Sequence, residues 1–295
     1  MISLMVDFIK VSVDKSFEKR LLENQKLEFN CKICYSTGVV DSNFLYAEYK
    51  GLRFNIINSE NDCKQTVITL EGSLHKFWND GKHNHNDFTN TNLDEVLNEL
   101  VHQFGLWPSD MRLRQIEFGV NIRYPECVDE IMNGCLEHKA KPFKYTFVRD
   151  EGKYIQAKHE NYIVKLYDKQ LQNCKRYPDL EPIMRFEVGY KRMYSLNKKG
   201  IYTLQDLVNY GLEEFGEELV CYWEAILFYD AKVFDGSDKQ YIYSNPKYWR
   251  ELSSTNFNYH RGQMRKALSK SSKSIKRTIR ALIKEKSEQL VSHTV

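Results

Sequence analysis

Residues 162–170 have the sequence YIVKLYDKQ. β-Branched and aromatic residues fill its first part and favour a strand, and the charged, helix-forming residues after it favour a helix. Tyr167 and Lys169 are therefore expected at a strand-to-helix junction. A phenol and an ammonium group can share one small site at such a junction.

Two other predicted strands carry polar groups on one face. Alternation along residues 115–122 places Glu117 and Asn121 on one face, opposite a row of apolar side chains. A shorter strand places Arg185 and Glu187 on a shared face in the same way. Together with the strand at 162–167, these strands predict one polar site on a sheet.

The rest of the chain predicts an α+β fold with a central antiparallel sheet and a helical C-terminal region. Short apolar runs separated by turn residues continue to about residue 193, and helices follow. Strands are expected at 4–8, 27–35, 45–49, 52–57, 66–70, 143–148 and 154–158. Helices are expected at 93–104, 128–136, 212–229 and 259–289, with a local break at 270–273.

We therefore predict three segments. Residues 1–195 would form the sheet domain that carries the polar site, residues 196–258 a helical region, and residues 259–295 a basic helical tail. The length of 295 residues allows one large domain or two modest ones.

The amino-acid composition indicates the cellular compartment in which the protein is expected to function. No run of about 18 apolar residues occurs, and the first residues lack a basic region, so neither a membrane span nor a signal peptide is expected. Seven scattered cysteines indicate free thiols in a reducing compartment, the cytoplasm. Cys31 and Cys34 are the only close pair, and without a second ligand pair they favour strand packing over structural zinc.

Charge is distributed unevenly along the chain. Residues 260–295 contain ten Lys and Arg and two Glu, a net charge of +8, which leaves −5 for the preceding 259 residues. Such asymmetry predicts an anionic partner, nucleic acid in preference to a membrane. The candidate DNA contacts in this tail are Arg265, Lys266, Lys276, Arg277 and Arg280.

A Tyr–Lys pair beside clustered carboxylates can cut a phosphodiester. Tyrosinate attacks phosphorus, a divalent cation held by the acids polarises the phosphate oxygens, and a lysine stabilises charge. A second interpretation remains open, in which Tyr167 is one of nineteen tyrosines in a β-rich core and Asp168 and Lys169 form a solvated edge.

Five motifs in order carry a resemblance to a known family. They are EGSLHK at 71–76, HNDFTNTNL at 85–93, RQIE at 114–117, Tyr-Asp-Lys at 167–169 and Arg-Phe-Glu at 185–187. Their order and gaps resemble the replication initiators of filamentous phages, the gene II protein family of rolling-circle, HUH-like endonucleases. More distantly they resemble plasmid initiators. The resemblance covers residues 66 to 205.

The resemblance implies a nickase that acts at a replication origin in the cytoplasm of a bacterial host. Tyr167 would be the nucleophile and Lys169 would lie near the phosphate. Mg²⁺ or Mn²⁺ would be held by Glu117 and Glu187, with Asn121 as a third ligand or as a group that hydrogen-bonds to a ligand. The expected partners are single-stranded and duplex origin DNA and a host helicase, while the oligomeric state is left open.

Two positions depart from the pattern. Glu117 stands where the family has Asp, and His83-Asn84-His85 lacks the apolar middle residue of the His-hydrophobic-His metal motif. His85 is therefore retained as a metal or site candidate without that motif. Arg185 is expected to orient Glu187 or clamp a phosphate.

Lys76 and the aromatic residues after it could bind single-stranded DNA by charge and stacking, or those rings could pack in the core. Two alternative functions remain. One is a relaxase or transposase with the same chemistry, and the other is a non-catalytic DNA-binding protein of the same fold.

Overall fold

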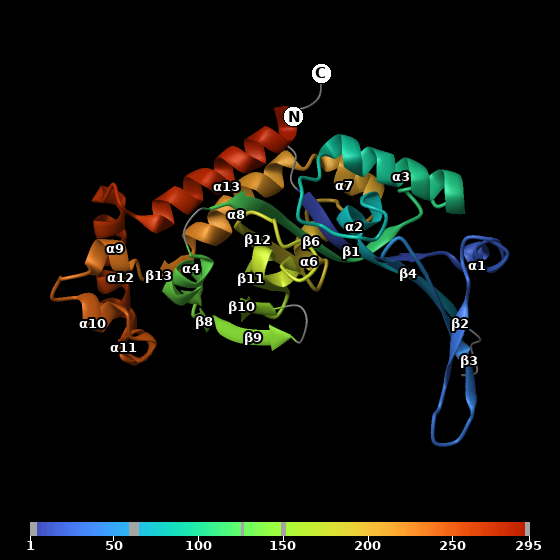
Figure 1. The fold of residues 1–295 in the computed structure, drawn as a ribbon, viewed down its shortest axis with the longest axis horizontal. Helices are drawn as coiled ribbons and strands as arrows, with labels where there is room; N and C mark the ends of the chain where they lie inside the picture. Colours follow the sequence, from blue (N-terminus) through green and yellow to red (C-terminus); the bar gives the residue numbers. More distant parts are fainter. Residues whose placement is uncertain (1–4, 59–64, 125–126, 149–151, 293–295) are drawn as a thin grey trace. The chain divides into compact units, whose positions relative to one another are not determined.

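The computed structural model describes residues 5–58, 65–124, 127–148 and 152–292. Ten strands form one sheet in the order β2-β3-β4-β5-β1-β6-β12-β11-β10-β9 (Figure 1). Their bounds are β1 (Met5–Val13), β2 (Asn30–Ile33), β3 (Val40–Tyr49), β4 (Leu52–Asn58), β5 (Thr66–Ser73), β6 (Arg112–Arg123), β9 (Lys144–Val148), β10 (Gly152–Lys158), β11 (Tyr162–Asp168) and β12 (Ile183–Tyr190). The predicted α+β class with an antiparallel sheet and C-terminal helices is confirmed.

The helices and the remaining strands lie between and after these strands. Their bounds are η1 (Lys15–Phe17), α1 (Glu18–Leu22), α2 (Leu74–Trp78), α3 (Asn90–Phe104), α4 (Val128–Gly134), β7 (Cys135–His138), β8 (Lys141–Pro142), α5 (Lys169–Asn173), α6 (Tyr194–Asn197), α7 (Leu204–Tyr210), α8 (Glu213–Glu224), β13 (Ile226–Phe228), α9 (Ala231–Phe234), α10 (Gln240–Tyr243), α11 (Pro246–Glu251), α12 (Ser254–Lys270) and α13 (Ile275–Ser292). No helix among the described residues is long and apolar enough to cross a membrane.

The chain folds as two compact units. Unit 1 comprises residues 1–119, 189–214 and 289–295, and unit 2 comprises residues 120–188 and 215–288. Strands β6 and β12 each contribute one part to unit 1 and one part to unit 2. Whether the chain also divides functionally at residue 195 stays a prediction.

Unit 1 is built on β1, which pairs antiparallel with β5 on one side and with β6 on the other. The apolar side chains of Ile9 and Val11 are completely buried between these neighbours. Helix α3 begins with a capping box in which Thr89 and Asn92 exchange hydrogen bonds, so it starts at Asn90, three residues before the predicted start at residue 93. Strands β2 and β3 form a hairpin that extends from the rest of unit 1 (Figure 1).

Strand β12 is buried along its whole length, and its residues 183–188 belong to unit 2. All eight residues of β12 are buried, including the charged residues Arg185 and Glu187. Strand β11 pairs antiparallel with β10, and this register sets Tyr154 directly opposite Tyr167. Strand β11 ends at Asp168 and α5 begins at Lys169, as the sequence predicts.

The helical part of unit 2 differs from the sequence prediction at two places. The helix predicted at 128–136 ends at Gly134, and the helix predicted at 212–229 ends at Glu224. The apolar residues that follow each helix form β7 and β13, which pair with one another antiparallel. A short apolar run fits a buried strand as well as a helix end, so only the pairing partner decides between them.

A separate apolar cluster holds the helices after β13 together. Its buried members are Leu136, Leu227, Phe234, Tyr243, Trp249, Met264 and Leu268. The indole nitrogen of Trp249 donates to the Tyr243 carbonyl at 2.9 Å, so the largest ring in the cluster has its polar atom satisfied. The predicted break at 270–273 is also observed, because α12 ends at Lys270 and α13 begins at Ile275.

Lys276 anchors the start of α13 in unit 2. Its ammonium nitrogen donates to the carbonyls of Glu224 at 3.0 Å and Ile226 at 2.7 Å, and its own carbonyl accepts from the indole of Trp223 at 2.9 Å. Only 6% of the residue is exposed. The predicted DNA contact by Lys276 is therefore wrong, because its charge is buried and bound to backbone.

Burial lowers the pKa of Lys276 to about 8 from the ordinary value of 10.5. Between these values the unfolded chain binds more protons than the folded protein, so the free energy of unfolding should rise with pH from about 8 to about 10.5. Lys276→Met should remove this rise, as measured by urea unfolding at several pH values. Lys284→Met, an exposed lysine of the same helix, is the control and should keep it. An unchanged pH dependence in Lys276→Met would contradict the assignment.

Candidate active site

The phenol of Tyr167 lies at the end of β11 in unit 2. Its hydroxyl donates to Oε2 of Glu187 at 2.7 Å, and Nη1 of Arg185 approaches the same hydroxyl oxygen at 3.4 Å. The side chain is half-buried, so one side of the ring remains accessible. A phenol placed between a carboxylate and a guanidinium has a proton acceptor and a cation within one hydrogen bond.

Glu187 receives a second partner from the same strand that carries the phenol. Nζ of Lys165 lies 3.1 Å from Oε1 of Glu187, whose side chain is only 3% exposed. A buried carboxylate is costly unless it is paired. Lys165 and Tyr167 are two residues apart on β11 and therefore share a face, so one strand supplies both partners.

Arg185 is completely buried and stands two residues before Glu187 on β12. Its Nε donates to Oδ1 of Asn121 at 2.9 Å. Asn121 was predicted as a metal ligand, but in this arrangement its carbonyl oxygen accepts from the guanidinium. Asn121 therefore orients Arg185, which in turn contacts the Tyr167 hydroxyl.

Lys169 is nearly completely buried rather than solvated. Its Nζ donates to Oε1 of Gln172 at 2.8 Å and lies 5.2 Å from the centroid of the Tyr167 ring. The turn that places it is fixed by Asp168, whose carboxylate accepts from the Leu171 amide at 2.9 Å. Lys169 thus meets the face of the phenol, where a cation favours negative charge on the ring.

A small open cavity of about 140 Å³ lies over these groups. Its lining residues are Tyr154, Lys165, Tyr167, Gln172 and Glu187. Sequence reasoning gave no role to Tyr154, Lys165 or Gln172. The i,i+2 spacing from Tyr167 could have indicated Lys165, whereas Tyr154 enters only through the register of β10 on β11.

The other predicted metal ligands belong to unit 1. The Glu117 carboxylate packs against Gly189, where an added Cβ would lie 2.9 Å from Oε1, so a larger residue at 189 would require the Glu117 side chain to shift. The ring of His85 stacks on that of His83 with centroids 4.1 Å apart. The neighbouring Asn84 is held by both carboxylate oxygens of Asp7, at 3.0 and 3.1 Å.

The predicted metal ligands are divided between the two units, with Glu117 and His85 in unit 1 and Glu187 and Asn121 in unit 2. Within the part of the chain that the structure describes, no group of three or more His, Cys, Asp or Glu could hold an ion. The oxygens of Glu187 interact with Tyr167 and Lys165, and Oδ1 of Asn121 accepts from Arg185. The metal set of Glu117, Glu187, His85 and Asn121 stays a prediction.

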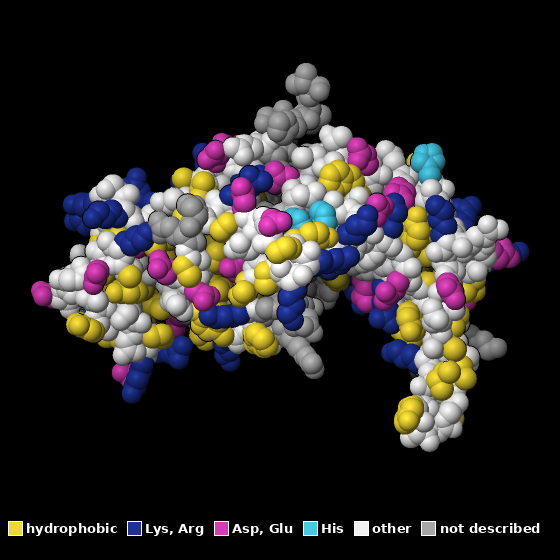
Figure 2. All heavy atoms as spheres, in the orientation of Figure 1, with side chains coloured by type: hydrophobic (Ala, Val, Ile, Leu, Met, Phe, Trp, Pro, Cys, Tyr) yellow, Lys and Arg dark blue, Asp and Glu magenta, His cyan; other side chains and the backbone are white. Residues whose placement is uncertain are grey.

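The predicted DNA contacts fall into two groups. Lys76, Arg265 and Lys266 are exposed, and Figure 2 shows Lys and Arg side chains gathered over the end of α12. Nη1 of Arg277 instead donates to two backbone carbonyls at the end of α12, at 2.9 and 3.1 Å. Arg280 pairs with Glu224 at 3.1 Å, with both side chains about half exposed.

The aromatic residues after Lys76 have structural roles. Phe77 is completely buried in unit 1, where it contacts the ring of Tyr49. The indole nitrogen of Trp78 donates to Glu95 at 2.7 Å. Phe77 is thus a core residue, whereas Trp78 is partly exposed beside the exposed Lys76, and a contact of Lys76 and Trp78 with DNA stays a prediction.

Comparisons with known proteins place one solved structure beside this chain. No family model matches the chain, and no curated protein matches it. The chain is similar to the rolling circle replication initiator protein from Geobacillus stearothermophilus, with 15% sequence identity and a TM-score of 0.38. The match covers 89% of this chain and 96% of that chain.

Lys165→Met tests the ion pair that holds Glu187. Removing one partner leaves a buried carboxylate, and unfolding free energy should fall by about 3 kcal/mol, the lower end for buried pairs because Lys165 keeps some exposure. Urea denaturation measures this loss. Adding Glu187→Gln in the same chain should recover part of it, because the uncompensated charge is removed.

The matched control is Lys10→Met, which breaks the more exposed Lys10–Glu71 pair at 2.7 Å. Such a pair should contribute no more than about 1 kcal/mol. Equal losses in Lys165→Met and Lys10→Met, or no recovery in the double variant, would contradict the role given to Lys165.

Proposed function

We propose that this protein is a DNA nicking and joining enzyme that initiates rolling-circle replication with Tyr167 as its nucleophile. One observation carries the proposal: the Tyr167 hydroxyl donates at 2.7 Å to a carboxylate that is itself buried and paired with a lysine. The resemblance of the ordered motifs to the gene II protein family supports the same assignment.

The chemistry assigned to Tyr167 is a transesterification. Its phenolic oxygen attacks the phosphorus of one phosphodiester, forming a 5′-phosphotyrosine bond while the bond to the 3′-oxygen breaks. The phenolic proton passes to Oε2 of Glu187, and the released strand leaves with a 3′-hydroxyl after protonation. Attack of a 3′-hydroxyl on the phosphotyrosine reverses these steps and rejoins the DNA.

The cations around the phenol suit this reaction. Lys165 pairs with Glu187, Arg185 contacts the Tyr167 hydroxyl, and Lys169 lies over the Tyr167 ring. A free phenol has a pKa of about 10, so few phenols are ionised at neutral pH. Positive charge fixed at the oxygen and the ring favours tyrosinate and the negative phosphorane-like transition state.

The proposed reaction is expected to require Mg²⁺ or Mn²⁺. When bound, a divalent ion would polarise the non-bridging oxygens of the scissile phosphate. In the proposed reaction, side chains of the protein carry out the nucleophilic attack and the proton transfer, and the ion takes part in neither step. Glu187 and Glu117 remain the carboxylates to vary first.

Exposed cations on α12 supply the proposed contact with duplex origin DNA. Arg265 and Lys266 are exposed and lie beside each other on that helix. Contacts of this kind hold phosphates without reading bases, and they weaken strongly as salt concentration rises. A host helicase stays a proposed partner.

Tyr167→Phe should abolish the covalent protein–DNA adduct. End-labelled single-stranded fragments of the replicon are incubated with protein and Mn²⁺ and separated on a denaturing gel. Tyr241→Phe is the control, since Tyr241 is 82% exposed in α10, away from the cavity lining, and should leave the adduct unchanged.

If the Tyr167→Phe protein still forms the adduct, the protein would remain a nicking enzyme, but Tyr167 would not be its nucleophile. DNA binding without an adduct from any fragment would favour the non-catalytic alternative. Mobilisation genes beside this gene, rather than a phage or plasmid origin, would favour the relaxase or transposase alternative.

Removal of divalent ions should also abolish the adduct. Protein treated with EDTA should form none, and added Mg²⁺ or Mn²⁺ should restore it. Glu187→Gln should lower the rate of adduct formation by at least about a hundredfold, because general-base catalysis typically contributes that much. Undiminished adduct in EDTA would exclude the metal requirement while leaving Tyr167 as the nucleophile.

A further inference from the structure

The cavity over Tyr167 has a second phenol in its lining. Tyr154 on β10 lines the same cavity and stands directly opposite Tyr167 in the register of β10 on β11. Directly opposite residues on neighbouring strands point to the same face of a sheet. The edge of one ring meets the other ring, with centroids 6.3 Å apart. One bound substrate can therefore meet both phenols.

The hydroxyl group of Tyr154 takes no part in holding the fold together. Tyr154 is half-buried, and its hydroxyl has no hydrogen-bond partner among the residues that the structure describes. This hydroxyl is open to solvent rather than buried. A packing role against Tyr167 would need only the ring, which phenylalanine would supply equally well. The hydroxyl is thus available to a substrate.

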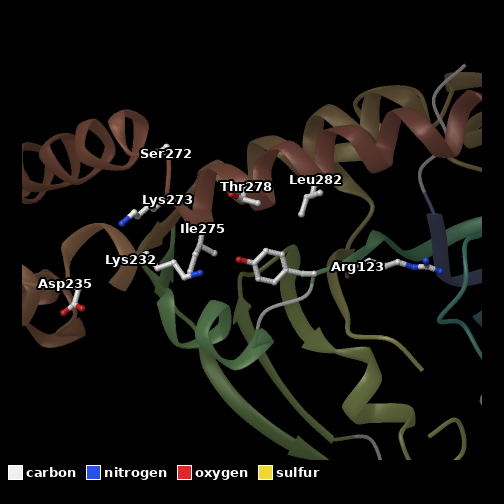
Figure 3. A pocket seen from close by; sticks show the side chains of 9 residues that line it. Arg123, Lys232, Asp235, Ser272, Lys273, Ile275, Thr278 and Leu282 are labelled. Carbon is white, nitrogen blue, oxygen red and sulfur yellow. The ribbon is translucent and has the colours of Figure 1, made fainter. Parts of the chain in front are cut away.

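Unit 2 also has a larger groove of about 780 Å³ beside α9 and the start of α13 (Figure 3). The tyrosine in its lining, Tyr124, is only 5% exposed. Figure 3 shows the Lys273 ammonium turned away from Lys232, so these two cations do not converge on one ligand. This groove therefore does not combine an accessible phenol with converging charges, whereas the Tyr167 cavity does.

Nicking by Tyr167 consumes the nucleophile. Once the phosphotyrosine bond has formed, the phenolic oxygen is esterified and cannot attack another phosphodiester. A closed product requires a second cut, because a new 3′-hydroxyl must attack the phosphotyrosine to join the ends. The second cut must be made close to Tyr167, since the released 3′-hydroxyl has to reach that phosphorus.

We infer that Tyr154 is the nucleophile of this second cut, an inference that rests on the proposed function. The phenolic oxygen of Tyr154 attacks a second phosphodiester, forms a bond to its phosphorus and breaks the bond to the 3′-oxygen. The new 3′-hydroxyl then attacks the phosphotyrosine at Tyr167. This joining step forms one phosphodiester and releases the Tyr167 phenol, while the 5′ end from the second cut stays on Tyr154.

Glu187 can accept the proton of each phenol in turn. It is the one carboxylate among the described residues that line the cavity, and its Oε2 accepts from the Tyr167 hydroxyl. Esterified Tyr167 has no proton to donate, so Oε2 is then open to the second phenol. In each cut the proton passes from phenol to carboxylate and then to the departing 3′-oxygen, which restores the charged Glu187. Lys165 in the same lining supplies positive charge near either phosphate.

The test loads both tyrosines of one chain. It uses the replicon fragment that forms the adduct, shortened so that the piece upstream of the cut dissociates and cannot rejoin. Two such oligonucleotides with different fluorophores are supplied together with Mn²⁺, and the products are separated on a denaturing gel. We expect a slower band that carries both colours. Denaturation separates copies of the protein, so two colours in one band belong to one chain.

Mass spectrometry of the wild-type protein locates the links. Trypsin cleaves after lysine and separates the tyrosines of this hairpin into peptides 154–158, 159–165 and 166–169. After nuclease digestion, a nucleotide should remain on the first and the third peptide, which contain Tyr154 and Tyr167. The middle peptide also contains one tyrosine and should carry none. This result does not depend on the folding of any variant.

Tyr154→Phe should remove the doubly linked band and the nucleotide on peptide 154–158. A singly linked band should persist, because phenylalanine keeps the ring that meets Tyr167. Tyr241→Phe is the control and should form both bands. A doubly linked band that survives in Tyr154→Phe, or a nucleotide on the middle peptide, would overturn the inference.

Two further results separate the second nucleophile from the proposed function. A single adduct at Tyr167 with no nucleotide on peptide 154–158 would reject Tyr154 as a nucleophile and leave the proposed function in place. No adduct from any fragment of the replicon would reject both.

Discussion

The buried charges of β12 are the constraint on which the centre of unit 2 depends. Arg185 and Glu187 lie on a strand whose residues are all buried, and an unpaired charge there would cost several kcal/mol. Their partners come from the two neighbouring strands, with Asn121 on β6 and both Lys165 and Tyr167 on β11. Because a shift of one residue would turn these partners to the opposite face, the charges also fix the strand register.

The same network gives the candidate site its chemistry. A carboxylate that accepts from a phenol is also a proton acceptor, and the cations that stabilise the carboxylate lie where a phosphate would carry negative charge. Tyr167 and Lys165 are the partly exposed members of this group, whereas Arg185, Glu187 and Asn121 are buried, so a substrate would meet the phenol and the Lys165 ammonium first. Stability and reactivity are thus supplied by one set of side chains, and changes to either will affect the other.

The cations of residues 260–295 fall into two groups that differ in the atoms around each side chain and not in their sequence pattern. Lys276 is buried and bonds to backbone carbonyls, whereas Arg277 and Arg280 are exposed and bond to carbonyls and to Glu224. Arg265 and Lys266 are exposed on α12. The basic tail predicted from the sequence therefore has two kinds of cation: some bond to backbone carbonyls or to Glu224, and others lie exposed on α12.

The sequence by itself determined the strand at 162–167, its passage into a helix, the alternation of β6 and β12, and the break before α13, because each is a local pattern of side-chain period or turn chemistry. It also identified Tyr167, Glu187 and Arg185 as one polar group. Only the tertiary structure decided that Tyr154 faces Tyr167, that Asn121 serves Arg185, and that β7 and β13 are strands. Cross-strand pairing and burial depend on residues distant in the chain, and no local period encodes which partner a polar atom will meet.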